Sequence, residues 1–540
     1  MHGLMMNTQL SIASILQHAE KVHRKSEIVS RKPEGGLFRY TYADAARRAR
    51  QAANLLTRLG VKQQDRVATL AWNTHRHYEL YYAVSGSGAI LHTVNPRLFP
   101  EQIVYILNHA EDEVLFLDLQ FVPLIEAIRD QLPKLKHVVL MVDAERMPES
   151  KLDLLCYETL LQEASAHYDW PALDENLAAT LCYTSGTTGN PKGVLYSQRS
   201  TVLHALASLS GEALSMGNRS VVLPVVPMFH VNAWGVPYAA TAAGAKLVLP
   251  GAGMDGASLY ELIDSEQVTQ MLGVPTVWLG LLQYCEKERC TMTSVEQVVI
   301  GGSAAPMSMI KGFQEKHNAF VVHAWGMTEL SPMGTVNSMN AYMASLDQAQ
   351  RYQLQVKQGR PIYGIELRIV DDAGNSLPQD GKAFGRLQAR GPWVASSYYK
   401  LEDQSDWQDG WFDTGDVATI DEQGYMNIVD RAKDVIKSGG EWISSIDVEN
   451  IAIGHDAVAE CAVVGVPHPK WDERPLLLVV LEPGASLTRE EMLEYLADKV
   501  VKWWLPDEVL FVDELPHTPT GKLLKRQLRD QYQGQYSGEA

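Results

Sequence analysis

Segment 183–194, YTSGTTGNPKGV, combines hydroxyl side chains, glycines and one lysine in a loop after the predicted strand AATLC. Backbone N–H groups and hydroxyls in such a loop can surround a polyphosphate, with Lys192 as a point charge. Glycines let the backbone come close to the ligand. The common phosphate loop has a different spacing, because here Lys192 precedes Gly193 and no Ser or Thr follows. A polar surface turn is the alternative interpretation.

Two carboxylates follow predicted strands or turns. Glu329 lies in HAWGMTEL (323–330), and near phosphates it could hold Mg²⁺, which favours one or two carboxylates plus phosphate oxygens. Asp416 ends GWFDTGD (410–416), where its carboxylate could accept hydrogen bonds from ribose hydroxyls. A solvated carboxylate is the alternative interpretation of Glu329.

A lysine near the C-terminus is the candidate cation for chemistry. Lys522 follows a glycine in PTGKLLKRQLR (519–529), at a turn before a basic helix. The other basic residues of that helix, Lys525, Arg526 and Arg529, are predicted to form a solvated face.

Two apolar segments contain polar residues with less certain roles. In PVVPMFHVNAWG (224–235), His230, Asn232 and Trp234 interrupt an apolar run, and core packing competes with a site. In VIGGSAAP (299–306), Ser303 follows a strand as in a nucleophile elbow, but the sequence is not G-x-S-x-G. We reject a hydrolase, since small residues here also allow a flat ring to approach closely.

Composition sets the broad class. A chain of 540 residues is expected to form roughly two to four units, each with its own core. The net charge of -18, from 47 basic and 65 acidic residues, argues against a general binder of nucleic acid or anionic membranes.

The compartment is inferred from cysteines and apolar runs. The 5 scattered cysteines fit a reducing compartment, and Cys285 and Cys290 lack the further ligands of a zinc site. The first residues predict a short amphipathic helix, not a signal peptide. No stretch reaches the ~18 apolar residues of a membrane span. We therefore expect a cytoplasmic enzyme with no nucleic-acid partner and no integral membrane segment.

Alternating strands and helices must position the candidate residues. DRVATLAWN (65–73) and EQVVI (296–300) are predicted strands. The alternation of strands and helices between them favours parallel sheets with right-handed crossovers. Ligands bind beyond the carboxyl ends of such strands. Segments 301–306 and 324–329 occupy such places.

The pattern changes towards the C-terminus. Short strands and turns dominate after about residue 355, including a predicted hairpin at DEQGY, and a smaller α+β pattern follows Asp430 with a capping box of Thr488 and Glu491. The predicted fold is α/β. Residues 1–430 form a large domain of parallel-sheet α/β subdomains plus a small β subdomain, and residues 431–540 form a smaller α+β domain that carries Lys522.

Taken in order, these motifs resemble the adenylate-forming superfamily of acyl-CoA synthetases over nearly the whole chain. The resemblance rests on YTSGTTGNPKG, WGMTEL, WFDTGD, DRAKDVIKSGG and PTGK. Five further segments are similar to medium- and long-chain fatty acyl-CoA synthetases and to methylmercaptopropionate–CoA ligases: PVVPMFHVNAWG, GVPTVW, GGSAAP, KSGGEWISSIDVEN and VPHPKWDERP.

The resemblance implies a two-step ligase that uses ATP, Mg²⁺ and coenzyme A, and a homodimer. A carboxylate attacks the α-phosphorus of ATP, and the repulsion between the two anions is much larger in a dry site than in water. A lysine beside both reactants offsets it, and Lys522 is the candidate. The thiolate of CoA then attacks acyl-AMP and releases AMP.

The resemblance also implies roles residue by residue. His230 would lie near the substrate carboxylate, Trp234 would gate the acyl tunnel, and Thr184 and Glu329 would associate with magnesium. The loop residues Thr184, Ser185, Gly186, Thr187, Thr188, Gly189 and Lys192 would bind the β- and γ-phosphates. Adenine and the α-phosphate would contact Gly302, Ser303, His323, Ala324, Trp325, Gly326, Met327 and Thr328, and the ribose would contact Asp416 and Arg431.

For the second step the resemblance implies rotation of a mobile C-terminal domain. Lys433 occupies the hinge position, and rotation would withdraw Lys522 and bring segment 437–442 to the site. The predicted pantetheine contacts are Lys437, Ser438, Gly439, Gly440 and Trp442.

The expected substrate is a short- or medium-chain apolar monocarboxylic acid, either a fatty acid or 3-methylmercaptopropionate. A long-chain fatty acyl-CoA synthetase is one alternative. An adenylating enzyme that loads a carrier protein, a luciferase-type oxygenase and a non-catalytic ATP-binding module are the others.

Overall fold

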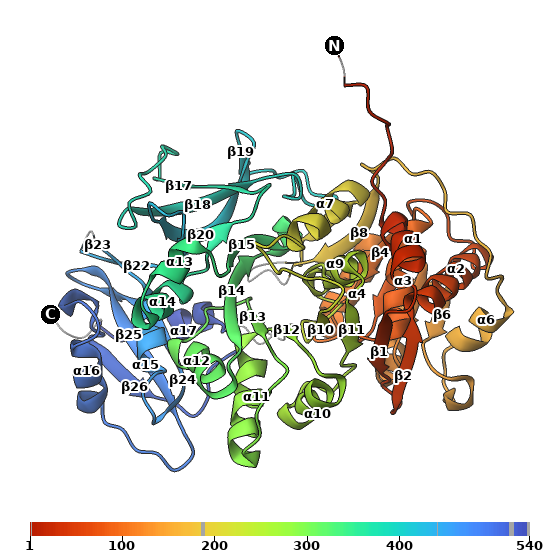
Figure 1. Ribbon diagram of the computed structural model, residues 1–540. Helices are drawn as coiled ribbons and strands as arrows, with labels where there is room; N and C mark the ends of the chain where they lie inside the picture. The colour runs from red at the N-terminus through yellow and green to blue at the C-terminus, as the bar shows by residue number, and fades with distance from the viewer. Residues whose placement is uncertain (2, 185–189, 440, 518–522, 537–540) are drawn as a thin grey trace. The chain divides into compact units, whose positions relative to one another are not determined.

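The computed structural model describes residues 1, 3–184, 190–439, 441–517 and 523–536. The chain divides into two compact units, which Figure 1 colours by residue number. The first unit comprises Met1–Ile365 and Gly391–Ser405, and the second comprises Glu366–Arg390 and Asp406–Ala540.

The larger sheet of the first unit has nine strands in the order β16-β15-β14-β13-β12-β10-β11-β1-β2. Its inner strands, from β14 to β1, run parallel to their neighbours, and the edge strands β15, β16 and β2 pair antiparallel. The predicted parallel sheet is confirmed. In sheet order the strands are β16 (Arg360–Pro361), β15 (Met333–Asn337), β14 (Phe320–Gly326), β13 (Gln297–Ile300), β12 (Gln270–Gly273), β10 (Val221–Pro224), β11 (Lys246–Leu249), β1 (Glu27–Arg31) and β2 (Leu37–Thr41).

The second sheet of this unit has seven strands, of which all but β9 pair parallel. Strands β8 and β9 form a hairpin that flanks the loop of residues 184–192, with Tyr183 opposite Gly193. In sheet order the strands are β7 (Leu154–Cys156), β6 (His137–Leu140), β5 (Val114–Leu117), β3 (Arg66–Leu70), β4 (Ile90–Thr93), β8 (Ala178–Tyr183) and β9 (Gly193–Ser197).

Helices connect the parallel strands, as right-handed crossovers require. The helices of the first unit are α1 (Ile12–Val22), α2 (Tyr42–Arg58), α3 (His75–Gly86), α4 (Pro100–Ala110), α5 (Val122–Ile128), α6 (Tyr157–Glu163), α7 (Gln198–Ser208), α8 (Val231–Trp234), α9 (Val236–Ala243), α10 (Gly256–Glu266), α11 (Pro275–Glu288), α12 (Met307–Lys311), α13 (Ala341–Ser345) and α14 (Gln348–Gln355). Short 3₁₀ turns are η1 (Leu119–Phe121), η2 (Arg129–Gln131), η3 (Ala144–Arg146) and η5 (Thr328–Leu330), and η4 (Gly312–Lys316) is a π-helical turn.

Helix α3 lies between the two sheets, because it contacts β4 and β8 of one and β1 of the other. All of its residues are buried, although several are charged. Arg76 donates from Nη1 to Glu34 and from Nε to Glu158, both at 2.7 Å. Paired charges of this kind tolerate burial, whereas loss of one partner would leave an uncompensated charge.

The core beneath the nine-stranded sheet is apolar and packs α10 and α11 against β12 and β13. Trp278 of α11 is fully buried there, and its Nε1 donates to the Val299 carbonyl at 3.3 Å. Helix α10 begins at an N-cap, since the Asp255 side chain accepts from the Ser258 N–H. This packing holds the carboxyl ends of the strands at one edge.

The second unit contains two five-stranded sheets. The antiparallel sheet is made of β17 (Glu366–Val370), β18 (Phe384–Arg390), β20 (Trp411–Ile420), β19 (Trp407–Gln408) and β21 (Met426–Arg431). The other is made of β23 (Glu441–Ile443), β22 (Ile436–Ser438), β25 (Asp472–Leu481), β24 (Val458–His468) and β26 (Glu508–Phe511). Its helices are α15 (Ser445–Ala452), α16 (Arg489–Ala497) and α17 (Lys525–Tyr532), and the remaining turn is η6 (Lys502–Trp504).

The predicted α/β fold is confirmed, with large parallel sheets in the N-terminal part and a smaller C-terminal part. The hairpin of β20 and β21 and the capping box of Thr488 and Glu491 are present as predicted. The sheet of β17 to β21 groups with the second unit. The domain boundary between residues 430 and 431 stays a prediction.

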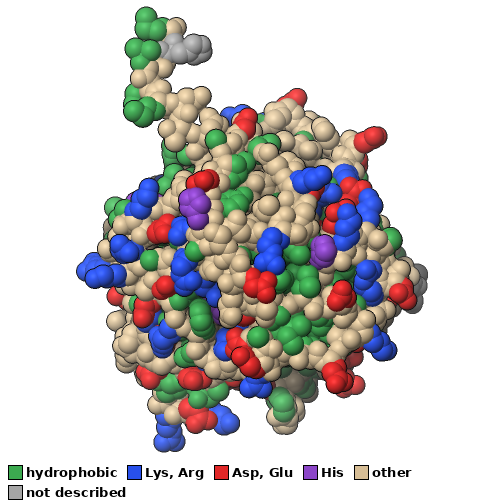
Figure 2. Space-filling model, turned by 90° about the vertical axis from the view of Figure 1, so that its right-hand side faces the viewer, with side chains coloured by type: hydrophobic (Ala, Val, Ile, Leu, Met, Phe, Trp, Pro, Cys, Tyr) green, Lys and Arg blue, Asp and Glu red, His purple; other side chains and the backbone are tan. Residues whose placement is uncertain are grey.

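Surface charge and helix length agree with the composition. On the face in Figure 2, basic and acidic side chains are interspersed. In the described part of the chain, no helix is long and apolar enough to cross a membrane.

Candidate functional site

The candidate site of the first unit is built at one edge of the nine-stranded sheet. Strands β10, β12, β13 and β14 are parallel, so their carboxyl ends lie at the same edge. The segments that follow them contain His230, Val274, Gly302 and Glu329. The predicted strand ends therefore lie at one edge, and the role of this edge as a ligand site stays a prediction.

A left-handed turn positions Trp234. Residues 231–234 have φ values of 46°, 52°, 48° and 57°, and Gly235 follows at 75°. Asn232 fixes the turn, because its Nδ2 donates to Thr180 Oγ1 of β8 at 3.1 Å. Asn232 is therefore a buried anchor between the two sheets, as the packing interpretation of this segment predicted.

The indole of Trp234 lies against glycine. A Cβ on Gly301 would stand 2.9 Å from Cη2 of Trp234 and 3.1 Å from the Ala324 carbonyl oxygen. Gly302 adopts φ of 82°, and a Cβ there would meet Val274 at 3.2 Å. The small residues after β13 thus allow a ring to approach the backbone, as VIGGSAAP predicted.

His323 is buried on β14 with neither ring nitrogen bonded to another described residue. Burial lowers the pKa of its imidazole to about 4, so the ring is neutral at pH 7. A neutral ring can donate from one nitrogen and accept at the other, which suits an uncharged ligand edge such as a purine.

Two glycines shape the turn that carries Glu329. A Cβ on Gly326 would stand 2.0 Å from the Pro332 carbonyl oxygen, so only glycine fits. A Cβ on Gly334 would stand 2.4 Å from the ring of Trp325. Beside them, the Tyr196 hydroxyl donates to the Thr328 carbonyl at 2.6 Å. Met327 begins the turn as the N-cap residue of η5.

Tyr398 links the phosphate-loop candidate to the candidate magnesium carboxylate. Its hydroxyl donates to Oε1 of the buried Glu329 at 2.7 Å. The ammonium of Lys192 lies 4.5 Å from the centre of its ring. Thr184 donates its N–H to the Lys192 carbonyl at 2.8 Å, which closes the base of the loop. The sequence analysis missed Tyr398.

The oxygen donors suit magnesium. Glu329 could supply a carboxylate and Thr184 a hydroxyl, both of the hard-oxygen kind that Mg²⁺ prefers, and these roles stay predictions. Among the described residues, no group of three or more His, Cys, Asp or Glu could hold a metal ion.

In the second unit, the ribose candidates pair with each other. Asp416 of β20 lies opposite Arg431 of β21 in the sheet, and Arg431 Nε is 3.0 Å from Asp416 Oδ1. Asp416 is buried and Arg431 is half exposed. The sheet register therefore presents a fixed carboxylate whose orientation the guanidinium holds.

The hinge candidate Lys433 lies near other cations. Burial, and then the positive charges of Arg431, Arg529 and Arg526, lower the pKa of its ammonium, while Asp434 opposes this shift. Arg529 itself forms an ion pair with Asp434.

The candidate CoA segment is held by residues of the VPHPKWDERP motif. Ser438 is buried, and its Oγ accepts from Arg474 Nη1 at 3.1 Å. Gly439 has φ of 59° and donates its N–H to the Trp471 carbonyl at 2.8 Å. The Lys437 N–H donates to Glu473 at 2.9 Å. Lys437 pairs with Trp442 in the hairpin of β22 and β23.

One prediction for the last helix is wrong. Lys525 is not part of a solvated face, because its ammonium lies 2.7 Å from Glu449 and its side chain is 11% exposed. Arg529 is also paired, whereas Arg526 is exposed as predicted. Helix α17 packs Leu528 into a core with β24 and β25, which turns its Lys525 edge inward.

Several predicted site residues lie outside the described residues. They are Ser185, Gly186, Thr187, Thr188, Gly189, Gly440 and Lys522.

Two family models define the class of this protein. The family model described as AMP-binding enzyme matches residues 16–399, and the model described as AMP-binding enzyme C-terminal domain matches residues 447–522. The chain belongs to the AMP-binding enzyme family, and the predicted resemblance is confirmed.

Particular relatives carry the names of CoA ligases. The chain is 52% identical to a 3-methylmercaptopropionyl-CoA ligase of Ruegeria lacuscaerulensis over 100% of both proteins. It is 51% identical to a medium-chain-fatty-acid–CoA ligase of Ectopseudomonas oleovorans over 98% of both. A crystal structure of an anthranilate CoA ligase in complex with anthranoyl-AMP matches with a TM-score of 0.87 at 26% identity, covering 98% of this chain and 99% of that one.

Proposed function

We propose that the protein is an AMP-forming acyl-CoA ligase for a short- or medium-chain apolar monocarboxylic acid. Its substrates are ATP, the acid and coenzyme A, and its products are the acyl-CoA thioester, AMP and pyrophosphate. The observation that carries the proposal is the match, at about half identity over essentially the full length, to CoA ligases for a thioether acid and for medium-chain fatty acids.

In the first half-reaction the acid attacks the α-phosphorus of ATP and pyrophosphate leaves. Lys192 and the backbone of its loop bind the β- and γ-phosphates, and Lys522 stabilises the charge at the reacting centre. Thr184 and Glu329 would hold Mg²⁺, which would offset phosphate charge when bound. Support for the metal role comes from Tyr398, whose hydroxyl orients the Glu329 carboxylate.

The remaining nucleotide contacts are assigned to individual residues. Gly302, Ser303 and the strand residues 323–325 form the adenine and α-phosphate region, with Gly326, Met327 and Thr328 in the following turn. Asp416 accepts from the ribose hydroxyls, and its ion pair with Arg431 supports this role.

In the second half-reaction the thiolate of CoA attacks the carbonyl of acyl-AMP and expels AMP. Residues 431–540 rotate about Lys433 between the two steps, so that Lys522 withdraws and segment 437–442 reaches the site. Lys437, Ser438, Gly439, Gly440 and Trp442 then contact the pantetheine arm. The fixed loop geometry at Gly439 supports this assignment.

The acid is a straight medium-chain fatty acid or 3-methylmercaptopropionate. Trp234 separates the nucleotide region from the acyl tunnel, and His230 faces the carboxylate. The contact of the Trp234 indole with Gly301 supports a gate at this point.

The enzyme acts as a cytoplasmic homodimer. All five cysteines are free, which suits a reducing compartment. Near the N-terminus Leu4, Met5 and Met6 are 96%, 88% and 94% exposed, and Figure 2 shows this apolar segment projecting at the top. Exposed apolar segments favour association. Light scattering that gives the mass of one chain would refute the dimer.

The test is AMP release with ATP, Mg²⁺ and CoA across a panel of acids: acetate, butyrate, hexanoate, octanoate, palmitate, 3-methylmercaptopropionate and a cinnamate. We expect the highest kcat/KM between butyrate and octanoate, and the value for the thioether relative to hexanoate separates fatty-acid from sulfur metabolism. Preference for palmitate over hexanoate would overturn the proposed chain length. Pyrophosphate exchange without CoA-dependent AMP release would overturn CoA as the acceptor.

A further inference from the structure

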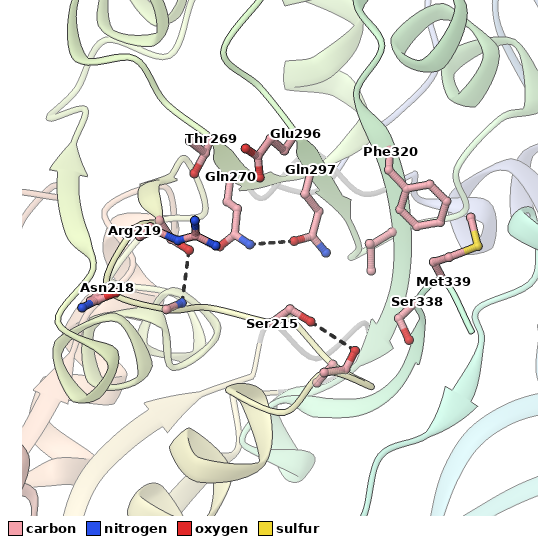
Figure 3. A pocket seen from close by; sticks show the side chains of 15 residues that line it. Ser215, Asn218, Arg219, Thr269, Gln270, Glu296, Gln297, Phe320, Ser338 and Met339 are labelled. Atoms are coloured by element: carbon pink, nitrogen blue, oxygen red, sulfur yellow. Dashed lines mark hydrogen bonds between the residues drawn. The ribbon is translucent and has the colours of Figure 1, made fainter. Parts of the chain in front are cut away.

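The first unit contains a cavity that the ligase chemistry does not use. Its volume is about 620 Å³, within the ~300–1,000 Å³ typical of small-molecule sites. It is enclosed by segment 211–220, which joins α7 to β10, and by the first residues of β12, β13 and β14 (Figure 3).

This cavity lies at the opposite edge of the sheet from the candidate active site. Gln270, Gln297 and Phe320 are the first residues of their parallel strands, whereas Gly301 and Glu329 follow the ends of such strands. At ~3.3 Å per residue, a four-residue strand separates the two edges by about 10 Å. The cavity is therefore distinct from the nucleotide and acyl regions.

A buried glutamine leaves a hydrogen-bond acceptor unused in the cavity. Gln270 is 7% exposed, and its Nε2 donates to the Leu214 carbonyl at 3.2 Å and to Gln297 Oε1 at 2.9 Å. Because both N–H bonds have acceptors, the amide orientation is fixed and Oε1 remains. Gln270 Oε1 is buried with no partner among the described residues. Buried polar atoms of this kind are normally satisfied, so Oε1 is expected to accept from water or from a bound ligand.

Charges of both signs line the same cavity. Arg219 and Glu296 are exposed, and the side chain of neither has an ion-pair or hydrogen-bond partner in the described part of the chain. Figure 3 draws Arg219 and Glu296 among the side chains that line the cavity, and the Glu296 N–H donates to the Thr269 carbonyl at 2.9 Å. The hydroxyls of Ser220 and Thr269 add polar contacts, and Phe320 adds an apolar surface.

We propose that this cavity binds a small zwitterion of the α-amino acid class. The ammonium donates to Gln270 Oε1 and is attracted by Glu296, while the carboxylate pairs with Arg219. The side chain of the ligand packs towards Phe320. A purely anionic ligand would bring no donor for Gln270 Oε1, and an apolar ligand would bring neither that donor nor a partner for the exposed charges of Arg219 and Glu296.

The probes are L-glutamine, L-serine and L-leucine, with dissociation constants measured by saturation-transfer NMR on the full-length enzyme. Matched analogues of glutamine remove one charge each: glutaramic acid lacks the ammonium, and 4-aminobutanamide lacks the carboxylate. We expect at least one amino acid to bind with a millimolar or lower dissociation constant. We expect its matched analogues to bind at least about tenfold more weakly.

Two variants of cavity residues test whether the amino acid binds in this cavity. Arg219→Ala and Glu296→Gln change exposed residues, so both variants should fold, and each should weaken binding about tenfold. Arg146→Ala is the matched control, because Arg146 is also exposed but lies on η3 outside the cavity. Absence of binding by all three amino acids, as in a cavity filled by water alone, would overturn the proposal. Equal affinity in the Arg219 and Arg146 variants would do the same.

Discussion

At the scale of single residues, the hydroxyl of Tyr398 connects two motifs that are far apart in sequence. It is 69 residues from Glu329 and yet donates to that carboxylate at 2.7 Å, while its ring lies beside the Lys192 ammonium. A hydrogen bond to a charged group orients it as well as stabilising it. Tyr398 is thus a positioning residue for the carboxylate that we propose holds magnesium.

Replacing Tyr398 with Phe should slow adenylation and leave folding intact. The change removes only the hydroxyl, and loss of a hydrogen bond to a charged group corresponds to roughly a 10- to 100-fold fall in kcat/KM. Acid-dependent pyrophosphate exchange measures this step, and raising Mg²⁺ should recover part of the rate. Tyr363→Phe is the control, since Tyr363 is 97% exposed. Equal rates in the two variants would contradict the positioning role.

Asp118 makes stability depend on pH. Its carboxyl is fully buried, Oδ2 accepts from the Trp72 N–H at 2.7 Å, and Oδ1 has no partner among the described residues. Burial raises the pKa of Asp118 from 3.8 to about 7. The folded protein therefore keeps a proton that the unfolded chain releases near pH 4. The ionised form above pH 7 destabilises the fold.

Asp118→Asn should therefore stabilise the protein, and more so at high pH. The amide keeps an acceptor for Trp72 and carries no charge, so the gain grows between pH 4 and pH 7 to at most about 4 kcal/mol. Thermal unfolding midpoints at pH 5 and pH 8 measure it. Asp130→Asn, at an exposed position, should show no such pH-dependent gain. A larger gain at pH 5 than at pH 8 would give the wrong sign and refute the assignment.

At the scale of elements, α8 has an unusual, left-handed backbone conformation. Each non-glycine residue in a left-handed turn costs roughly 1–2 kcal/mol, and Val231 to Trp234 are consecutive residues of this kind. The hydrogen bond from Asn232 to Thr180 and the glycine that ends the turn offset part of this cost. Such strain persists where the surroundings impose it, and here it places Trp234 against Gly301.

Gly235→Ala should disturb this turn. A Cβ would stand 2.8 Å from two atoms of the His204 ring, and the φ of 75° disfavours alanine. We expect a loss of about 1–3 kcal/mol in stability and a larger rise in KM for the acid than for ATP, because Trp234 shifts. Thermal unfolding and initial rates measure the two effects. Gly280→Ala in α11, where a Cβ meets open space, should not destabilise the fold. An unchanged KM for the acid would show that the turn does not shape the acyl tunnel.

Local sequence predicted several elements but not this one. Period and propensity located β3, β13 and the hairpin of β20 and β21, because each pattern contains its own signal. The left-handed conformation of α8 depends on Thr180, which is 52 residues from Asn232. In the same way, the solvated face expected for α17 was wrong because Glu449, on another helix, pairs with Lys525. Contacts distant in sequence determined both outcomes.

At the scale of the whole molecule, the predicted site residues are divided between the two units. Lys192, His230 and Glu329 belong to the first, and Asp416 and Lys433 belong to the second. Lys522 lies in the part of the sequence matched by the C-terminal family model. A ligase with two chemically different steps needs a cation beside the α-phosphate only in the first of them, which makes a separate C-terminal domain useful.

Lys522→Ala should therefore abolish one half-reaction and spare the other. Without the ammonium, the approach of the carboxylate to the α-phosphate is unscreened, and we expect acyl-AMP formation to fall by at least about 100-fold. Thioester formation from supplied acyl-AMP and CoA should change by less than about threefold, because that step expels AMP without a new attack on phosphorus. Arg526→Ala is the matched control, since Arg526 is an exposed cation on the neighbouring helix. If the rates of both half-reactions fell equally, Lys522 would be needed for binding or folding rather than for adenylation. Withdrawal of Lys522 would then no longer explain why the domain rotates.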